Sequence, residues 1–258
     1  MNGIGAIVEK LRRATVSVGA GSGVVWRDDG VIVTNAHVVR GRRVPVELWD
    51  GRRFEVAVEK SWPARDLAVL RIPTNHLDSV QPRELGTLRT GEWAVAVGNP
   101  FGFQGAVSTG LVQGVQALGN QRWVTASVRL APGNSGGPLA DAQGRLLGIN
   151  TLISGGLGFA APADEIARYL TRGAPPRLGV TVRPVTQGLL ILEVEPDSAA
   201  ARASLLPGDT LVEVAGRTLR TPWDLAQALE TAEWNPLELV FRRGAEPHAR
   251  RVTRARAA

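Results

Sequence analysis

The sequence contains no cysteine, which excludes a disulfide scaffold, a thiol nucleophile and a zinc site with cysteine ligands. Lysine is nearly absent as well, since Lys10 and Lys60 are the only two. No apolar run approaches the roughly 18 residues of a membrane-spanning helix, and the N-terminal apolar stretch is too short for a signal peptide and is interrupted by Glu9. The composition, 44% hydrophobic and 21% charged, is that of a globular protein, so we do not expect disorder.

Arginine supplies almost all of the positive charge in a chain whose formal net charge is +6. A nucleic-acid-binding protein would gather these residues on one face with aromatic residues among them. Here acidic residues lie between the clusters, so we expect solvated faces with weak attraction to polyanions. The clusters are 12–13, 40–43, 52–53, 242–243 and 250–256.

Short segments rich in β-branched residues fill the first two-thirds of the chain, with turn residues between them. They form two groups of about six, which predicts two antiparallel barrels at about 14–85 and 92–162, joined by 86–91. The predicted strands are 16–18, 24–26, 31–34, 44–49, 54–59 and 67–72, followed by 93–97, 106–115, 122–128, 138–140, 146–151 and 157–161.

A helix at 164–171 and a stiff Gly-Ala-Pro-Pro linker at 173–176 end this region. The remainder alternates strands with helices and is long enough to fold as a small α+β domain. The sequence therefore predicts two domains, 1–173 and 174–258. The predicted elements of the second domain are strands 179–183, 189–194, 210–214 and 237–242 and helices 198–203 and 221–231.

Three polar residues lie in settings that packing alone does not explain. His37 follows an apolar strand, Asp66 heads another, and Ser135 lies within the glycine-rich turn Gly-Asn-Ser-Gly-Gly-Pro. Alone, the first two are more often structural. Together, in the order His, Asp, Ser, they match the chymotrypsin-type arrangement of a catalytic triad, with the active site between the two barrels.

The chain resembles the HtrA (Deg) family of trypsin-like serine proteases that carry a C-terminal PDZ domain. The resemblance implies a mainly β fold: two six-stranded antiparallel barrels of chymotrypsin type and a small α+β PDZ-like domain. The matching segments are Gly-Ser-Gly-Val-Val at 21–25, Asp-Gly-Val-Ile-Val-Thr-Asn-Ala-His-Val-Val at 29–39, Asp-Leu-Ala-Val-Leu at 66–70, Val-Gly-Asn-Pro-Phe-Gly at 97–102, the segment 132–139, Gly-Ile-Asn-Thr at 148–151 and Gly-Phe-Ala-Ala-Pro at 158–162.

The resemblance implies an endopeptidase that cleaves unfolded or misfolded protein. Ser135 is the expected nucleophile, His37 the base that takes its proton, and Asp66 the acid that orients the imidazole. Backbone N–H groups of Gly133 and Ser135 are expected to form the oxyanion hole, with Asn134 shaping the loop between them. No metal or cofactor is expected, and His76 and His248 are expected at the surface.

The resemblance also points to a small-to-medium apolar specificity pocket formed by Leu130, Asn150, Thr151, Leu152, Phe159 and Ala160. Arg129 leaves open a preference for acidic residues. In the PDZ-like domain, the N–H groups of Leu178, Gly179 and Val180 are expected to hold peptide C-termini, with helix 221–231 beside the groove. The alternative is a plain α+β domain that only packs on the protease.

The sequence departs from the family pattern at Ser127 and Ala131, where Asp and Asn are usual. This leaves a second hypothesis open, a chaperone-like peptide-binding protein with a largely silent protease site. The family resemblance allows a homotrimer. As written, the chain is expected in the cytoplasm; the alternative is an exported protein whose leader is missing from this sequence.

Overall fold

The computed structural model describes residues 3–41, 43–118, 121–172, 177–232 and 236–253. Contacts between Cα atoms divide the chain into two compact units, one made of Met1–Gln116 with Arg122–Thr171 and one that holds Arg172–Ala258. The predicted linker 173–176 and the last part of the arginine cluster, 254–256, lie outside the described residues.

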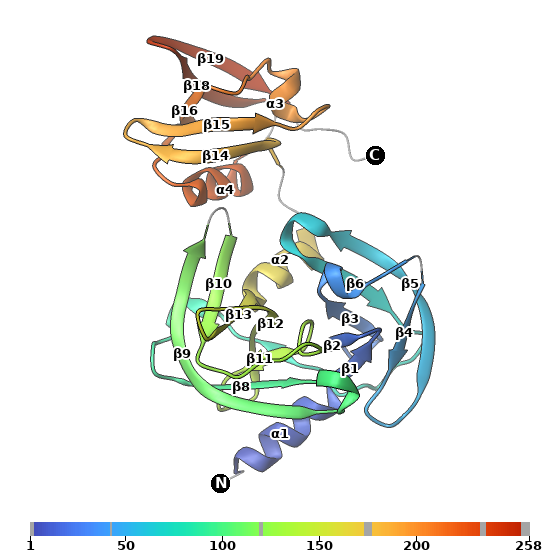
Figure 1. The fold of residues 1–258 in the computed structure, drawn as a ribbon. Coiled ribbons are helices and arrows are strands. Elements are labelled where there is room, and N and C mark those ends of the chain that lie inside the picture. The colour runs from blue at the N-terminus through green and yellow to red at the C-terminus, as the bar shows by residue number, and fades with distance from the viewer. Residues whose placement is uncertain (1–2, 42, 119–120, 173–176, 233–235, 254–258) are drawn as a thin grey trace. The chain divides into compact units, whose positions relative to one another are not determined.

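The first barrel is closed by six antiparallel strands in the order β1-β2-β3-β6-β5-β4, drawn in blue to cyan in Figure 1. Each of the six strands expected here is present. Their bounds are β1 Thr15–Val18, β2 Gly21–Arg27, β3 Val31–Thr34, β4 Arg43–Glu47, β5 Arg53–Trp62 and β6 Leu67–Arg71.

The second barrel follows the order β11-β8-β9-β10-β13-β12 and closes through the pairing of β11 with β12. The two-residue strand β7 (Gln81–Pro82), which we did not predict, adds to β12 in parallel. The other bounds are β8 Trp93–Gly98, β9 Ala106–Leu118, β10 Gln121–Ala126, β11 Pro138–Ala140, β12 Arg145–Ser154 and β13 Leu157–Pro162. The mainly β architecture with two six-stranded barrels is thus confirmed.

The two barrels share part of their hydrophobic core. One buried cluster contains Val24, Val33 and Leu67 of the first barrel together with Val97 and Ile149 of the second. Burial of apolar side chains at this junction stabilises the pair by roughly 25 cal/mol per Å² removed from water. Two of the strands that meet there are β3 and β6, and His37 and Asp66 lie at their ends.

Two helices pack on this unit. α1 (Ile4–Arg13) was not predicted; its Leu11 is fully buried, and Ile7 and Val8 pack against the shared core. The apolar residues recur three or four positions apart, as on one face of a helix, but over too few turns to stand out. α2 (Ala163–Arg172) lies where a helix was expected and has Asp164 and Glu165 in its first turn.

The second unit is one antiparallel sheet in the order β14-β15-β16-β18-β19 with β17 beside β16, covered by short helices. Alternation along β18 puts Leu237, Leu239 and Phe241 in the core. Thr221 begins α4 with a capping box completed by Asp224. The bounds are β14 Val180–Val185, β15 Gly188–Val194, α3 Ala199–Arg202, β16 Thr210–Val214, β17 Arg217–Thr218, α4 Pro222–Thr231, β18 Leu237–Arg243 and β19 Glu246–Val252. β17 and β19 were not predicted.

Among the described residues, no helix is long and apolar enough to cross a membrane. The same part of the chain has no group of three or more His, Cys, Asp or Glu side chains placed to hold a metal ion.

Candidate active site

His37 and Asp66 are joined by a short hydrogen bond. His37 Nδ1 lies 2.6 Å from Asp66 Oδ2, and the backbone N–H of His37 donates to Asp66 Oδ1 at 2.9 Å. The imidazole remains half exposed while the carboxylate is 28% exposed. With its proton on Nδ1, the ring donates to Asp66 and leaves the Nε2 lone pair free to accept a proton.

Two short 3₁₀ turns bring these side chains together. His37 lies in η1 (Ala36–Val38), directly after β3, and Asp66 ends η2 (Pro63–Arg65), directly before β6. Because β3 and β6 are neighbours in the barrel, both turns emerge at the same place. Asp66 has a left-handed backbone, φ 51°, ψ 43°, which asparagine and aspartate tolerate better than most residues.

Asn35 holds the backbone of Asp66 in place, a role we did not predict. Its fully buried side-chain amide donates to Asp66 O at 2.9 Å and to Thr151 Oγ1 at 3.0 Å, so one amide joins the two barrels. Its Oδ1 is buried without a partner among the described residues. The only signal in the sequence is the Thr-Asn-Ala-His segment itself.

The loop that carries Ser135 is held by Ser22 of the first barrel. Ser22 N–H donates to Ser135 O at 2.8 Å, and Ser22 Oγ donates to Gly133 O at 2.6 Å. The same hydroxyl accepts from Asn99 N–H at 2.9 Å. Ser22 is fully buried, so these bonds are protected from water. The sequence showed Ser22 only as part of a matching segment, without a role.

Ser135 lies beside the turn that carries His37. A Cβ built on Gly21 would be 3.0 Å from Ser135 O and 2.9 Å from a methyl group of Val38, the residue after His37. The hydroxyl of Ser135 donates to Thr151 O at 3.4 Å. Within the described residues, no hydrogen bond joins it to the His37 ring.

The amides of Gly133 and Ser135 have no acceptor in the described part of the chain. Gly133 has φ +103°, and a Cβ there would lie 2.7 Å from Asn99 O, so this position requires glycine. Asn134 is buried, and its side chain donates to Ala131 O at 3.1 Å. Unbonded amides one residue apart can hold a negative charge.

The residues expected to line a specificity pocket differ in the exposure of their side chains. Leu152 is 41% exposed and pairs across the sheet with Phe159, which is buried. Ala160 belongs to the core of the second barrel, and Asn150 is buried and donates to Pro138 O at 2.9 Å. A Cβ on Gly158 would lie 3.0 Å from Leu130 Cδ1.

Three neighbouring positions raised questions in the sequence. Arg129 is exposed, and its N–H donates to Ser108 Oγ at 2.8 Å. Ser127 bonds to the backbone of Leu111 through its hydroxyl. Ala131 contributes its carbonyl, which accepts from both the backbone and the side chain of Asn134.

A second loop with unbonded amides begins the other unit. Within the described residues, neither Leu178 N–H nor Gly179 N–H has an acceptor. Their carbonyls hold the loop in place, since Leu178 O accepts from Ala200 N–H and Gly179 O from Glu195 N–H. Gly179 has φ +79°. Val180 begins β14, an edge strand of the sheet.

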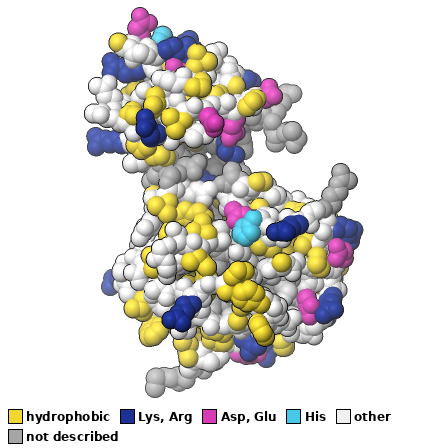
Figure 2. Space-filling view, in the orientation of Figure 1, with side chains coloured by type: hydrophobic (Ala, Val, Ile, Leu, Met, Phe, Trp, Pro, Cys, Tyr) yellow, Lys and Arg dark blue, Asp and Glu magenta, His cyan; other side chains and the backbone are white. Residues whose placement is uncertain are grey.

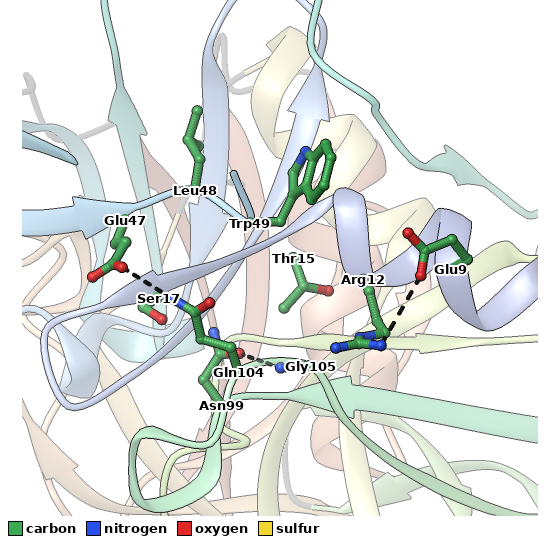
Figure 3. A pocket seen from close by; sticks show the side chains of 10 residues that line it. All are labelled: Glu9, Arg12, Thr15, Ser17, Glu47, Leu48, Trp49, Asn99, Gln104 and Gly105. Carbon is green, nitrogen blue, oxygen red and sulfur yellow. Dashed lines mark hydrogen bonds and ion pairs between the residues drawn. The ribbon is translucent and has the colours of Figure 1, made fainter. Parts of the chain in front are cut away.

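A polar pocket of about 230 Å³ lies between α1, β1, the end of β4 and the loop before β9 (Figure 3). Its charged groups are largely satisfied within it: Gln104 donates to Glu47 at 3.1 Å, and Arg12 lies 4.0 Å from Glu9. None of the three candidate catalytic residues lines it. Its walls are Glu9, Arg12, Thr15, Ser17, Glu47, Leu48, Trp49, Asn99, Gln104 and Gly105.

Glu165 is a buried carboxyl in the first turn of α2. Burial raises its pKa to about 7, although the charges of Arg65 and Arg122 act in the opposite direction. Tyr169 of α2 packs against Trp62, with ring centroids 5.9 Å apart. Because Trp62 directly precedes η2, this ring contact supports the turn that presents Asp66.

The remaining expectations concern the surface. Lys and Arg side chains lie in separate places on the face that Figure 2 shows, as expected of solvated arginines. His76 is exposed. His248 differs from the expectation, because it is half-buried and its ring stacks on Phe241 at 5.3 Å.

Comparison with known proteins gives matches over both units. Residues 21–149 match the trypsin-like peptidase domain, and residues 190–243 match the PDZ domain. The bovine mitochondrial serine protease HTRA2 is 34% identical over 272 residues, covering 90% of this chain and 59% of that protein. Human serine protease HTRA3 is 30% identical over 301 residues, covering 94% and 66%. The chain belongs to the HtrA family of trypsin-like serine proteases with a C-terminal PDZ domain.

Solved structures of HtrA proteins agree with this assignment. The HtrA-type protease AlgW, solved with a decapeptide, superposes with a TM-score of 0.83 at 25% identity, covering 99% of this chain and 100% of that one. The serine endoprotease from Yersinia pestis gives a TM-score of 0.80 at 27% identity, covering 100% and 99%. The chain spans only 54% to 66% of the length of the first curated HtrA relatives it matches.

Proposed function

We propose that this HtrA-family chain is an active serine endopeptidase in which Ser135 is the nucleophile, His37 the general base and Asp66 the acid that orients it. The observation that carries the proposal is the double contact of Asp66 with both Nδ1 and the backbone N–H of His37. That contact selects one tautomer and one ring orientation, which an aspartate beside a catalytic histidine must do.

The reaction proceeds through an acyl-enzyme. His37 Nε2 takes the proton of Ser135 as its oxygen attacks the scissile carbonyl carbon, and the negative charge that develops is stabilised by the amides of Gly133 and Ser135. His37 then gives the proton to the leaving amine as the C–N bond breaks. Water repeats the sequence on the ester, which releases the acid and restores the Ser135 hydroxyl.

The substrates that we propose are unfolded or misfolded polypeptides, with the PDZ domain binding peptide C-termini. The amides of Leu178 and Gly179 are available for a terminal carboxylate. β14 is an edge strand, so an extended peptide can add to it as a further strand. The alternation of partly buried and exposed residues at the start of β14 gives such a peptide one apolar side to contact, that of Val180 and Val182.

Fluorophosphonate labelling tests the active site directly, because the reagent phosphonylates only an activated serine, whose oxygen displaces fluoride from phosphorus. We expect labelling of the wild-type chain and none of Ser135→Ala, with casein turnover lost in parallel. His37→Ala is the second variant, and it should lose labelling although Ser135 is intact. A folded wild type that takes no label under any activating condition rules out the proposal.

A second candidate function is a chaperone-like protein whose protease site is largely silent. It is favoured by the Ser135 hydroxyl, which donates to Thr151 O and not to the imidazole. Catalytic hydrogen bonds are often formed only when substrate binds, so the two candidates differ in what a ligand does. Casein turnover is therefore measured with and without added C-terminal peptides. Turnover that appears with peptide supports the protease, whereas suppression of casein aggregation without any cleavage supports the chaperone.

A further inference from the structure

Two phenylalanines beside the Ser135 loop are the most exposed large hydrophobic side chains of the described chain. Phe101 is 73% exposed and Phe103 is 72% exposed. Both belong to the loop between β8 and β9, which includes η4 (Pro100–Gly102). On the face drawn in Figure 2, hydrophobic side chains gather where Figure 1 shows this loop. Single exposed apolar residues are ordinary, but two aromatic rings on one short loop are not.

Hydrogen bonds hold the backbone of this loop in a conformation that carries an energetic cost. Phe103 N–H donates to Pro100 O at 2.9 Å, and Phe101 N–H donates to Pro132 O at 3.4 Å. Phe101 has a left-handed backbone, φ 54°, ψ 24°, which is unfavourable for a bulky residue and easily adopted by glycine. Because the Phe101 ring is exposed, its contacts within the protein do not offset the backbone strain, which points to a role in binding.

The Ser135 loop has two flanks, and these phenylalanines lie on the one opposite to β12. On the β12 flank, Asn150 N–H donates to Gly137 O at 2.8 Å. On the other flank, a Cβ on Gly133 would be 2.7 Å from Asn99 O, so the start of the β8–β9 loop lies directly against the proposed oxyanion hole. If the acyl side of an extended substrate lies along β12, the residues after the scissile bond pass over the other flank, beside the β8–β9 loop.

We propose that Phe101 and Phe103 form the binding site for apolar residues that follow the scissile bond, that is, for the amine side of the substrate. This inference rests on the proposed protease function and adds a substrate class to it. Unfolded polypeptides expose apolar residues, and these can contact an aromatic ring whatever the surrounding substrate sequence is. The exposed Leu152 and Ile153 at the end of β12 offer a comparable apolar surface for the acyl side.

Acyl transfer to added amines measures this site alone. A peptide ester first acylates Ser135 and loses its alcohol. The acyl-enzyme then reacts either with water or with an added amine. When the amine reacts, its nitrogen forms an amide bond as the ester bond to Ser135 breaks, and its proton passes through His37 to the serine oxygen. The probes are leucine amide and glycine amide. We expect the full-length wild type to favour leucine amide over glycine amide, because only the former has a side chain for the rings.

Two variants and one control sharpen the result. Phe103→Ser should lower the leucine-to-glycine ratio by about threefold to tenfold, in the range of a partial loss of apolar contact. Phe101→Gly should lower it similarly while the melting temperature stays the same or rises, because glycine relieves the left-handed backbone. Leu206→Ser, which removes a half-exposed apolar side chain from the PDZ unit, should leave the ratio unchanged.

The outcomes separate the two levels of the proposal. A wild type that hydrolyses the ester but shows the same ratio as both phenylalanine variants overturns the subsite and leaves the protease standing. Absence of any acylation overturns both. If Phe103→Ser changes the mass of the native complex in solution and not the ratio, the rings form an interface between copies of the chain, and the subsite is wrong.

Discussion

The loops at Gly133 and at Gly179 use the same backbone device in two different settings. Each has a glycine with positive φ and two amides without acceptors in the described part of the chain. The Gly133 loop is held by buried side-chain bonds from Ser22, carries the Ser135 hydroxyl and lies beside the turn that carries His37. Among the described residues, the hydrogen bonds that hold Leu178 and Gly179 are backbone bonds, and the neighbouring Arg177 pairs with Glu195 at 3.0 Å.

The difference shows what turns an anion site into a catalytic one. A loop that meets a permanent carboxylate needs only amides that point outwards and an edge strand beside it. A loop that meets charge only during a reaction must keep its amides in place while bonds change, so it gains from rigid support by the first barrel. The two proposed roles follow from these surroundings. Gly133→Ala and Gly179→Ala test the two loops, and Glu165→Gln and Thr151→Val test the stability of the first unit.

Gly133→Ala should have the largest effect. An added Cβ meets Asn99 O at 2.7 Å and opposes φ +103°, so the amide must turn away. We expect kcat to fall by about 10² to 10³, as when one oxyanion donor is lost. Casein or ester hydrolysis measures it. Gly51→Ala, also at positive φ but with open space around it, is the matched control and should keep its rate. Equal rates in both variants would contradict the role given to the Gly133 amide.

The pH dependence of stability should distinguish the two units next. The raised pKa of Glu165 means that the folded state holds this proton more tightly than the unfolded state, so its stabilising effect is present below pH 4.5 and is lost as the pH rises through about 7. The shift corresponds to about 3 kcal/mol. Asp209 and Asp224 of the PDZ unit have lowered pKa values, because burial, which raises the pKa, is outweighed by hydrogen bonds to the carboxylates. Their contribution to stability is therefore lost only as the pH falls below 3.8 and these carboxylates become protonated.

Urea unfolding of the full chain at pH 5 and pH 8 measures this difference. Glu165→Gln should remove the loss in the first unit between the two pH values, and the PDZ transition should stay the same. A first unit that loses the same stability with and without the carboxyl would show that Glu165 is not the titrating group.

Thr151→Val should have a smaller effect, confined to the barrels. It removes the hydroxyl that accepts from Asn35 at 3.0 Å and donates to Ile149 O at 2.9 Å, without changing the shape of the side chain. The free energy of unfolding of the first unit should fall by about 1 to 3 kcal/mol, because buried polar groups lose partners. Thr151→Ser keeps the hydroxyl and should recover most of the loss. No difference between Val and Ser would mean that the bond between the barrels contributes nothing.

Gly179→Ala should have the smallest effect on the enzyme and act only on peptide binding. Its Cβ would lie 2.2 Å from Ser198 Cβ at φ +79°, which displaces the loop. We expect the Kd for a C-terminal peptide to rise at least about tenfold, in line with the cost of a non-glycine residue in such a conformation. Fluorescence anisotropy with a labelled peptide measures it. Hydrolysis of a short ester should be unchanged, and a fall there would break the proposed separation of the two loops.

Much of the fold was predictable because its signals are local. All twelve predicted barrel strands are present, and α4 begins with an ordinary capping box at Thr221. The missed elements lacked such signals. β7 is two residues long and is defined by its pairing with β12, and β19 carries charged residues that we treated only as an arginine cluster. α1 is amphipathic but short.

The candidate site was predictable in its residue types and order and not in its support. His37, Asp66 and Ser135 stand out in the sequence because their segments are unusual for packing. Ser22 and Asn35 do not, since a serine or asparagine near a strand end has many ordinary roles. Their partners lie on distant strands, so no nearby pattern reveals them.

By itself, the sequence determined the strands, the turns and the order of the three polar residues, because alternation and turn chemistry act between neighbours along the chain. Only the tertiary structure decided that Ser22 holds Gly133, 111 residues away, and which amides remain without acceptors. Those features arise when both barrels close and bring distant backbone groups together in a buried space, where each group must find a partner or face a ligand.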